Sequence, residues 1–198
     1  MRLLNAVKYF GNEPIEVWNG SSWEVVPQIQ SSVQTFDRFL GPRSFGQRQR
    51  ILLVGSSEDV LDGYEFIRLS NGERYIILSH NQDMEYGEAY GVSYVIQKAP
   101  YDASVMQLVT ETAPSGLGGT TTPTQVATTF CDMERYTSEG SSEADTVRYG
   151  IFTMLFPLSM KGVVTTDSEI LIDGVYYEVK EVSPLLEILE IRTLQRGV

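Results

Sequence analysis

The sequence is poor in the side chains from which most metal and redox sites are built. Its 198 residues include one cysteine, Cys131, and one histidine, His80. A single cysteine excludes a disulfide within the chain and fits synthesis in the reducing cytosol. A single histidine excludes a metal site built from several histidines of one chain. We therefore expect His80 to be a surface imidazole and Cys131 a buried thiol, rather than a reactive pair.

Long hydrophobic runs and helical periodicity are also missing. No run approaches the roughly eighteen apolar residues of a membrane-spanning helix. The first twelve residues, MRLLNAVKYFGN, lack the apolar core of a signal peptide, so we expect neither a membrane segment nor a signal peptide. No segment longer than about ten residues carries a helical period. With 42% hydrophobic and 21% charged residues, the chain is expected to be globular and all-β.

Motifs of the common enzyme classes are absent. There is no Gly-x-Ser-x-Gly elbow, no phosphate-cradling Gly-x-x-x-x-Gly-Lys and no calcium-binding loop. The pairs Glu58–Asp59 and Glu187–Glu190 could perform acid–base chemistry on a sugar, as in a hydrolase. Because the chain has 26 acidic residues, a solvated acidic surface is the expected explanation for such pairs. The sequence therefore predicts a protein that is not an enzyme, with no catalytic residues, no metal and no cofactor.

A hairpin with two strands and a return strand is predicted between Thr165 and Arg196. Apolar residues alternate on both sides of Asp173-Gly174, a pair that takes up the positive φ angles of a tight hairpin turn. A similar hairpin is predicted at Ile67–Asn81 around Asn71-Gly72, at an offset of 102 residues. At this offset Tyr75 falls on Tyr177, and Ile77 falls on Val179. The alternatives are a structural repeat or one continuous β-domain with two similar hairpins.

A third hairpin is predicted near the start of the chain. Trp18 and Trp23 flank the loop Asn19-Gly20-Ser21-Ser22 and can pack against each other across the strands. An aromatic platform that stacks on sugars or bases is the functional alternative. From 112 to 125 the sequence is rich in Gly, Pro and Thr, which is typical of an interdomain linker or a projecting loop.

These patterns predict two tandem small β-barrel or sandwich units. The expected N-terminal domain spans 1–110 and includes an arm and a long loop at 28–49. The expected linker spans 111–125, and the expected C-terminal barrel spans 126–198.

Charge is unevenly distributed along the chain. The formal net charge is −11, which argues against a protein that coats nucleic acid with its whole surface. Residues 38–50 instead carry four arginines and no acid. We expect this segment to form an interface with an acidic protein surface, while a phosphate contact with DNA is the rival, since arginine binds either group. The candidate interface residues are Arg38, Arg43, Arg48, Arg50, Phe36, Phe39 and Phe45.

The C-terminal stretch resembles the small β-barrel stopper, or head-completion, proteins of the tailed-phage neck. The resemblance covers Val126 to Gly197. It is carried by an acid-bounded strand that enters the Asp173-Gly174 turn, by a Tyr-x-Val at Tyr177–Val179, and by a charged return strand closing at Ile191-Arg192-Thr193-Leu194. Other phage β-barrel components, among them tail-tube, nozzle and baseplate modules, share this pattern.

The resemblance implies a structural virion protein made in the host cytoplasm. The implied assembly is a homo-oligomeric ring of six- or twelve-fold symmetry that joins the head to the tail. The implied partners are a portal or adaptor protein on the head side, a tail protein on the distal side, and genomic DNA that is retained by the ring or passes through it, with no membrane. A receptor- or carbohydrate-binding β-module remains an alternative, as does a hydrolase.

Overall fold

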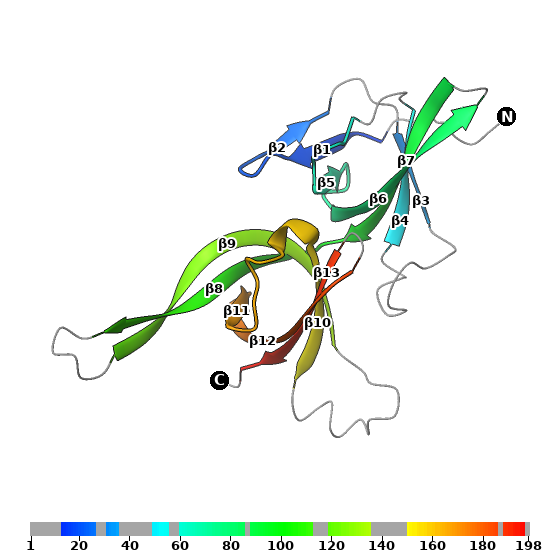
Figure 1. Ribbon diagram of the computed structural model, residues 1–198. Helices are drawn as coiled ribbons and strands as arrows, with labels where there is room; N and C mark the ends of the chain where they lie inside the picture. Colours follow the sequence, from blue (N-terminus) through cyan, green and yellow to red (C-terminus); the bar gives the residue numbers. More distant parts are fainter. Residues whose placement is uncertain are drawn as a thin grey trace, which may run out of the picture. The chain divides into compact units, whose positions relative to one another are not determined.

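The structure is a computed structural model that describes residues 13–26, 31–35, 49–55, 60–85, 88–112, 119–135, 150–185 and 188–196. It is all-β, which confirms the predicted fold class. The chain divides into two compact units, Met1–Pro100 and Tyr101–Val198 (Figure 1). Within the described residues, the one helical turn is the 3-10 helix η1 (Leu158–Met160). None of the helical structure described is long and apolar enough to cross a membrane.

The first unit contains a seven-stranded sheet with the order β2-β1-β5-β6-β7-β4-β3. Its strands are β1 (Ile15–Trp18), β2 (Trp23–Val25), β3 (Ser31–Thr35), β4 (Gln49–Val54), β5 (Phe66–Leu69), β6 (Arg74–Glu85) and β7 (Glu88–Lys98). Every pairing in the sheet is antiparallel. The start of β1 also meets the start of β3. The Glu13 backbone N–H donates to the Ser31 carbonyl at 3.1 Å, and the Ser31 hydroxyl donates to the Glu13 carbonyl.

The second unit is a closed antiparallel barrel with the order β10-β13-β12-β11-β8-β9. Its strands are β8 (Tyr101–Thr112), β9 (Gly119–Arg135), β10 (Ile151–Pro157), β11 (Ser168–Ile172), β12 (Val175–Pro184) and β13 (Ile188–Gln195). Pairing of β9 with β10 closes the ring of strands. Closure removes the sheet edges over this part of the unit, which leaves a rigid block.

The two units share one order of strands. In the first unit the order β1-β5-β6-β7-β4-β3 occupies the places that β8-β11-β12-β13-β10-β9 occupy in the second. The Glu13–Ser31 contact lies where Tyr101 pairs with Cys131 in the closed barrel. The hairpins at Gly72 and Gly174 therefore occupy the same position in their respective sheets.

Rows of paired residues across the strands make this correspondence residue-specific. The row in the first unit is Val17, Ile67, Tyr75 and Lys98. The row in the second unit is Val105, Ile170, Tyr177 and Gln195. In both rows the first three side chains are buried and belong to the hydrophobic core of their unit. The alternation of buried and exposed residues on these strands follows from the two-residue period of a strand.

An irregularity of pairing recurs at the same place in both units. The register between β6 and β7 shifts between Ile77 and Ser79, and that between β12 and β13 shifts between Val179 and Glu181. Such a bulge bends a strand and increases its twist, as closure of a small barrel requires. The bulges lie at the offset that the sequence predicted for the two hairpins.

The predicted domain boundaries are corrected by the structure. The division falls after Pro100 and not near 110, and β8 and β9 pair from Tyr101–Cys131 to Thr112–Gly119. Residues 111–112 and 119–125 of the expected linker are therefore strand, and the second unit begins well before 126. The threonines of this segment are β-branched and favour a strand, although threonine is also common in linkers.

The expected long loop at 28–49 is also corrected in part. Residues 31–35 form β3, and Gln49 is the first residue of β4. The expected arm at 1–12 and residues 28–30 and 36–48 of the loop lie outside the described residues.

Candidate assembly surface

The β8–β9 hairpin continues beyond the barrel that it helps to build. The ladder between β8 and β11 ends at Gln107, and the ladder between β9 and β10 covers only Asp132–Arg135. Residues 108–112 and 119–126, which we call the distal ribbon, are therefore paired mainly with each other. Figure 1 shows this pair of strands extending as a twisted ribbon away from β11 and β12.

The distal ribbon exposes apolar side chains on both of its faces. Leu108 is 47% exposed, Val109 is 43% exposed and Val126 is 44% exposed. Leu108 and Val109 are neighbours in a strand, so they point to opposite faces. A two-stranded ribbon is marginally stable in water on its own. This segment therefore presents apolar surface and strand edges that a partner could cover.

Comparison with the first unit shows which part of the hairpin is additional. There β1 and β2 pair from Glu16–Val25 to Trp18–Trp23, and the loop Asn19–Ser22 follows at once. The Asn19 side chain organises this loop by accepting hydrogen bonds from the Ser21 and Ser22 backbone N–H groups, both at 2.9 Å. The first unit in turn extends a different hairpin, since β6 and β7 pair as far as Glu85–Glu88.

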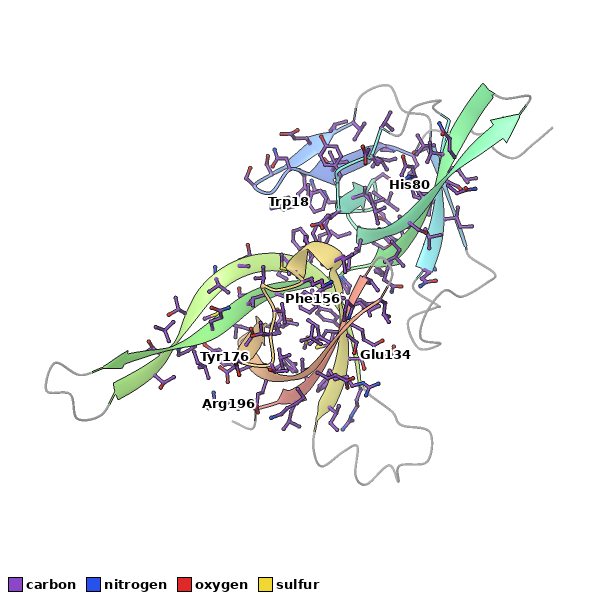
Figure 2. The ribbon with its side chains drawn as sticks, viewed as in Figure 1. Trp18, His80, Glu134, Phe156, Tyr176 and Arg196 are labelled. Atoms are coloured by element: carbon purple, nitrogen blue, oxygen red, sulfur yellow. The ribbon has the colours of Figure 1, made fainter. Side chains whose placement is uncertain are left out.

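A buried carboxylate lies where the hairpin leaves the barrel. Glu169 of β11 pairs with Met106, two residues before the distal ribbon begins. Its side chain is 5% exposed and accepts a hydrogen bond from Arg196 Nη1 at 2.7 Å. Its Oε2 atom is buried and has no hydrogen-bond partner among the described residues. Arg196, labelled in Figure 2 beyond β13, therefore compensates the charge of Glu169.

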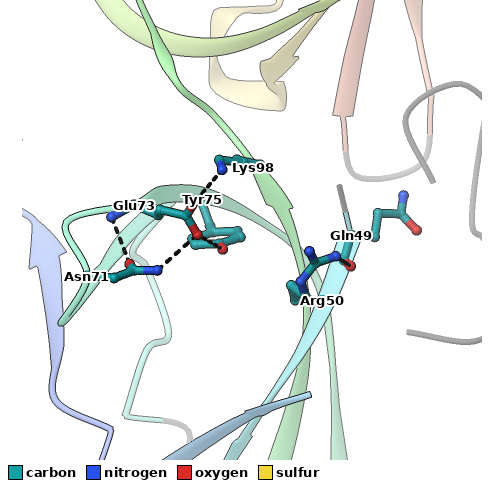
Figure 3. A network of polar contacts seen from close by, with 6 residues as sticks. All are labelled: Gln49, Arg50, Asn71, Glu73, Tyr75 and Lys98. Carbon is teal, nitrogen blue, oxygen red and sulfur yellow. Dashed lines mark hydrogen bonds and ion pairs between the residues drawn. The ribbon is translucent and has the colours of Figure 1, made fainter. Parts of the chain in front are cut away.

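A network of polar contacts in the first unit surrounds Glu73 (Figure 3). Its carboxylate accepts hydrogen bonds from Lys98, from the Tyr75 hydroxyl at 2.8 Å and from Asn71 Nδ2 at 3.0 Å. The Lys98 and Tyr75 hydrogen bonds lower the pKa of Glu73 to about 2. Burial and the hydrogen bond to Glu73 raise the pKa of Tyr75.

This network fits a structural role better than an acid–base role. A carboxylate with a pKa of about 2 is a weak base at neutral pH, far from the match that general base catalysis requires. The network instead ties the β5–β6 turn to the end of β7. The equivalent tyrosine of the second unit, Tyr177, has its pKa raised by burial and then by Tyr101, Asp173 and Cys131.

The two tryptophans pack against each other across β1 and β2, as the sequence predicted. Their ring centroids lie 5.3 Å apart. The Arg68 guanidinium lies 4.9 Å from the centroid of Trp23, and Arg68 is ion-paired with Glu16. One face of Trp23 is thus already covered by a cation, which weighs against a stacking platform for sugars or bases.

The predicted turn residues take the conformations that the hairpins require. Gly72 has φ +79°, Asp173 +49° and Gly174 +80°. The second turn contains only Asp173 and Gly174, since Ile172 pairs with Val175. The first turn is longer, because the Leu69 backbone N–H donates to the Glu73 carbonyl across three residues that include Asn71. The sequence therefore located both turns correctly, but the expected mirror-image pair at Asn71-Gly72 is wrong, because Asn71 does not take a positive φ.

Most of the predicted interface residues cannot be compared with the structure. Phe36, Arg38, Phe39, Arg43, Phe45 and Arg48 lie outside the described residues. Arg50 is described, lies half-buried in β4 and donates from Nη1 to the Gln49 carbonyl at 2.7 Å. The distal ribbon was missed as a site, because its Gly, Pro and Thr content was interpreted as a linker. The signal that could have found it is the run of β-branched residues on either side of 113–118.

The chemistry-bearing side chains of the described residues do not converge on one point. Cys131 is buried in the core of the second unit, whereas His80 is exposed on β6 of the first. Within the parts of the chain that the structure describes, no group of three or more His, Cys, Asp or Glu side chains could hold a metal ion.

Comparison with protein-family models gave no match, and comparison with curated proteins gave none either.

Proposed function

We propose that this chain is a structural subunit built from two tandem copies of one small six-stranded β-barrel, and that it assembles into a homo-oligomeric ring. The observation that carries the proposal is the strand order shared by both units, together with a ribbon that only the second unit extends. Barrels are rigid blocks with few open edges, and ring symmetry turns a modest contact into a closed assembly.

Three features support the duplication within the proposal. The strand order is the same, the bulges after Ile77 and Val179 coincide, and the cross-strand rows through Tyr75 and Tyr177 place buried residues at matching positions. In the first copy, the strand equivalent to β9 is divided into β2 and β3. Its ladder with β1 continues through the backbone hydrogen bond from Val26 to Ile15 and the one from Glu13 to Ser31.

The place that we propose for the ring is the neck of a tailed phage, between the portal or adaptor protein and the tail. The resemblance of the C-terminal stretch to stopper proteins supports this placement. In such a ring, DNA passes through or is held back in the lumen. The net charge of −11 supports this use, because an acidic lumen does not neutralise phosphates and would not retain the duplex by counterion release.

The arginine-rich segment 38–50 has a defined part in this proposal. It binds an acidic surface of the next subunit or of the adjoining ring, because arginine pairs with carboxylates in a two-pronged geometry. The acidic character of the rest of the chain supplies such surfaces. Replacing Arg43, Arg48 and Arg50 with alanine should abolish ring formation and leave DNA affinity unchanged. Intact rings with altered DNA retention would assign the segment to the lumen instead.

The direct test of the proposed function is electron microscopy of the purified protein and of virions from the phage that encodes it. The expected result is a ring with an open centre in the purified sample, and antibody labelling at the head–tail junction of the virion. A protein absent from virions that binds an oligosaccharide saturably would overturn the proposal.

A further inference from the structure

We infer that the distal ribbon is the element through which one copy of this chain binds a second copy, by strand addition along the outer edge of β8 and by burial of the ribbon's apolar side chains. This inference rests on the proposed function, because it names the contact by which the ring subunits meet. It concerns residues 108–112 and 119–126, of which the sequence assigned 111–112 and 119–125 to a linker.

The ribbon is not required to complete the barrel. In the first unit β1 and β2 supply the equivalent pairing, and four residues close that hairpin directly after the Trp18–Trp23 pair. The core cluster of the second unit reaches Val105 on β8 and the partly buried Ala127 on β9, and Met106 is the last buried residue of β8 before the ribbon begins. An extension that contributes nothing to the core of its own unit still costs ordering entropy, which contacts elsewhere must offset.

The ribbon has the chemistry of a strand-addition partner. Both of its strands are rich in β-branched residues, which favour extended backbone. Leu108 and Val109 offer apolar surface on opposite faces. An incoming strand would satisfy backbone groups along an open edge, and its side chains would cover the apolar residues. This arrangement converts a marginal two-stranded ribbon into a sheet of three strands or more.

The edge of β8 is better suited to pairing than the edge of β9. Pro123 pairs with Leu108 in the ribbon, and a proline has no N–H to donate. This pair must therefore be of the non-hydrogen-bonded kind, which leaves the outer edge of β9 without one donor. Thr110 lies two residues beyond Leu108, at a pair of the same kind. Its N–H is consequently directed to the outer edge of β8, where an added strand can accept it.

The charge of the chain favours a second copy as the occupant of this nearly uncharged edge. Every copy carries a net charge of −11, so most pairs of surfaces on two copies repel each other. Between Ser104 and Phe130 the only charged residue is Glu111. The ribbon is thus a part of the described chain that two copies can bring together with little like-charge repulsion. It also lacks the basic side chains that a phosphate backbone would require.

The test compares the wild-type chain with three variants of the full-length protein. The first carries Leu108→Lys and Val109→Lys. The second carries Thr110→Pro, which removes the outward donor of β8 and retains the extended backbone. The third replaces residues 108–123 with Asn-Gly-Ser-Ser, the loop of the first unit, and leaves the Gln107–Thr124 pair in place. The matched control is Val25→Lys, which places a lysine on the equivalent hairpin at a side chain that is 65% exposed.

Sedimentation and electron microscopy measure assembly, and circular dichroism measures folding. We expect the wild type and Val25→Lys to assemble, while the three ribbon variants stay folded and need at least about tenfold higher concentration, corresponding to about 1.4 kcal/mol. Rings that form equally well without the ribbon would overturn this inference and leave the proposed function standing. An assembly that depends on the ribbon but has no open centre would overturn the proposed function and leave this inference standing. A wild type that stays monomeric, or that assembles only with another protein or with DNA, would overturn a second copy as the occupant.

Discussion

The first unit closes its β1–β2 hairpin with four residues, whereas the second continues the corresponding β8–β9 hairpin to Thr112 and Gly119. On β6 and β7 the difference is reversed, because the first unit continues to Glu85–Glu88 and the second stops at Pro184–Leu189. The cores beneath these hairpins use the same strand order. The comparison therefore separates the residues that build the shared order of strands from the residues that each unit adds to it.

The largest expected effect comes from the two cores. Phe156, which lies inside the second barrel (Figure 2), is fully buried, and so is Val54 at the matching position of the first unit. Phe156→Ala should cost about 3–5 kcal/mol of unfolding free energy, because it removes a large side chain and leaves a cavity.

Tryptophan fluorescence can show which unit a core substitution destabilises. Both of them, Trp18 and Trp23, lie in the first unit. Phe156→Ala should lower the denaturant midpoint seen by circular dichroism and leave the midpoint of tryptophan fluorescence in place. Val54→Ala is the matched control that should lower the fluorescence midpoint. Equal shifts of both signals by either variant would show that the units unfold as one body.

A smaller effect is expected at the base of the distal ribbon. Arg196→Ala leaves the Glu169 carboxylate buried without its cation, which should cost about 2 kcal/mol after allowance for the exposure of the arginine. Lys180→Ala is the control, because its ion pair with Glu178 is exposed and is worth at most about 0.5 kcal/mol. Thermal melts of both variants at neutral pH provide the comparison. Equal losses would mean that Glu169 is not held by Arg196.

The Glu73 network should make the stability of the first unit depend on pH in a way that the second unit does not share. Glu73→Gln should cost about 1 kcal/mol at pH 7, since it removes a charge-assisted contact with Lys98 that is partly exposed. The pKa of Glu73 is lowered from 4.5 to about 2 in the folded chain, so the unfolded chain binds its proton first as the pH falls.

The stabilisation by Glu73 is therefore complete above pH 4.5, declines below it and is lost by about pH 2. Denaturation followed by tryptophan fluorescence at several pH values should show the variant and the wild type converging over this window. Glu181→Gln in the second unit is the control and should leave that signal unchanged. A difference that persists undiminished at pH 2 would contradict the assignment of the effect to Glu73.

The smallest effects are expected at the two turns. Gly72→Ala and Gly174→Ala each place a Cβ at a positive φ angle, although no neighbouring atom lies within 4 Å of either added Cβ. Each variant should lose about 1 kcal/mol of unfolding free energy through backbone strain alone. Chemical denaturation of the two variants gives the values. A large loss at one turn and none at the other would argue against equivalent roles for the hairpins.

The sequence predicted the all-β class and both central hairpins because turn pairs and alternating apolar residues are local signals. It matched Tyr75 with Tyr177 because β6 and β12 keep one offset. The other strands depart from that offset, since the loops between them differ in length and β2 and β3 interrupt the strand that β9 continues. Residue spacing alone therefore cannot reveal which strands of the two units correspond. The strand pairing reveals it, because pairing places Ile67 and Ile170 at matching positions of their cross-strand rows.

The distal ribbon could not be recognised from composition alone. Threonine, glycine and proline occur in linkers as well as in exposed strands, and only the pairing partner distinguishes them. Thr122 lies opposite Val109, and Pro123 lies opposite Leu108. Composition also does not reveal the ion pair of Glu169 and Arg196, because nothing in the sequence distinguishes a buried carboxylate among 26 acidic residues.

The most direct test of this account is amide hydrogen exchange of the wild-type protein below and above its assembly concentration. The account predicts that amides of residues 108–112 exchange rapidly in the dilute protein and are protected at least about tenfold on assembly, while β12 and β13 are protected in both states. Unchanged exchange in the ribbon, with new protection only on the first unit, would contradict it.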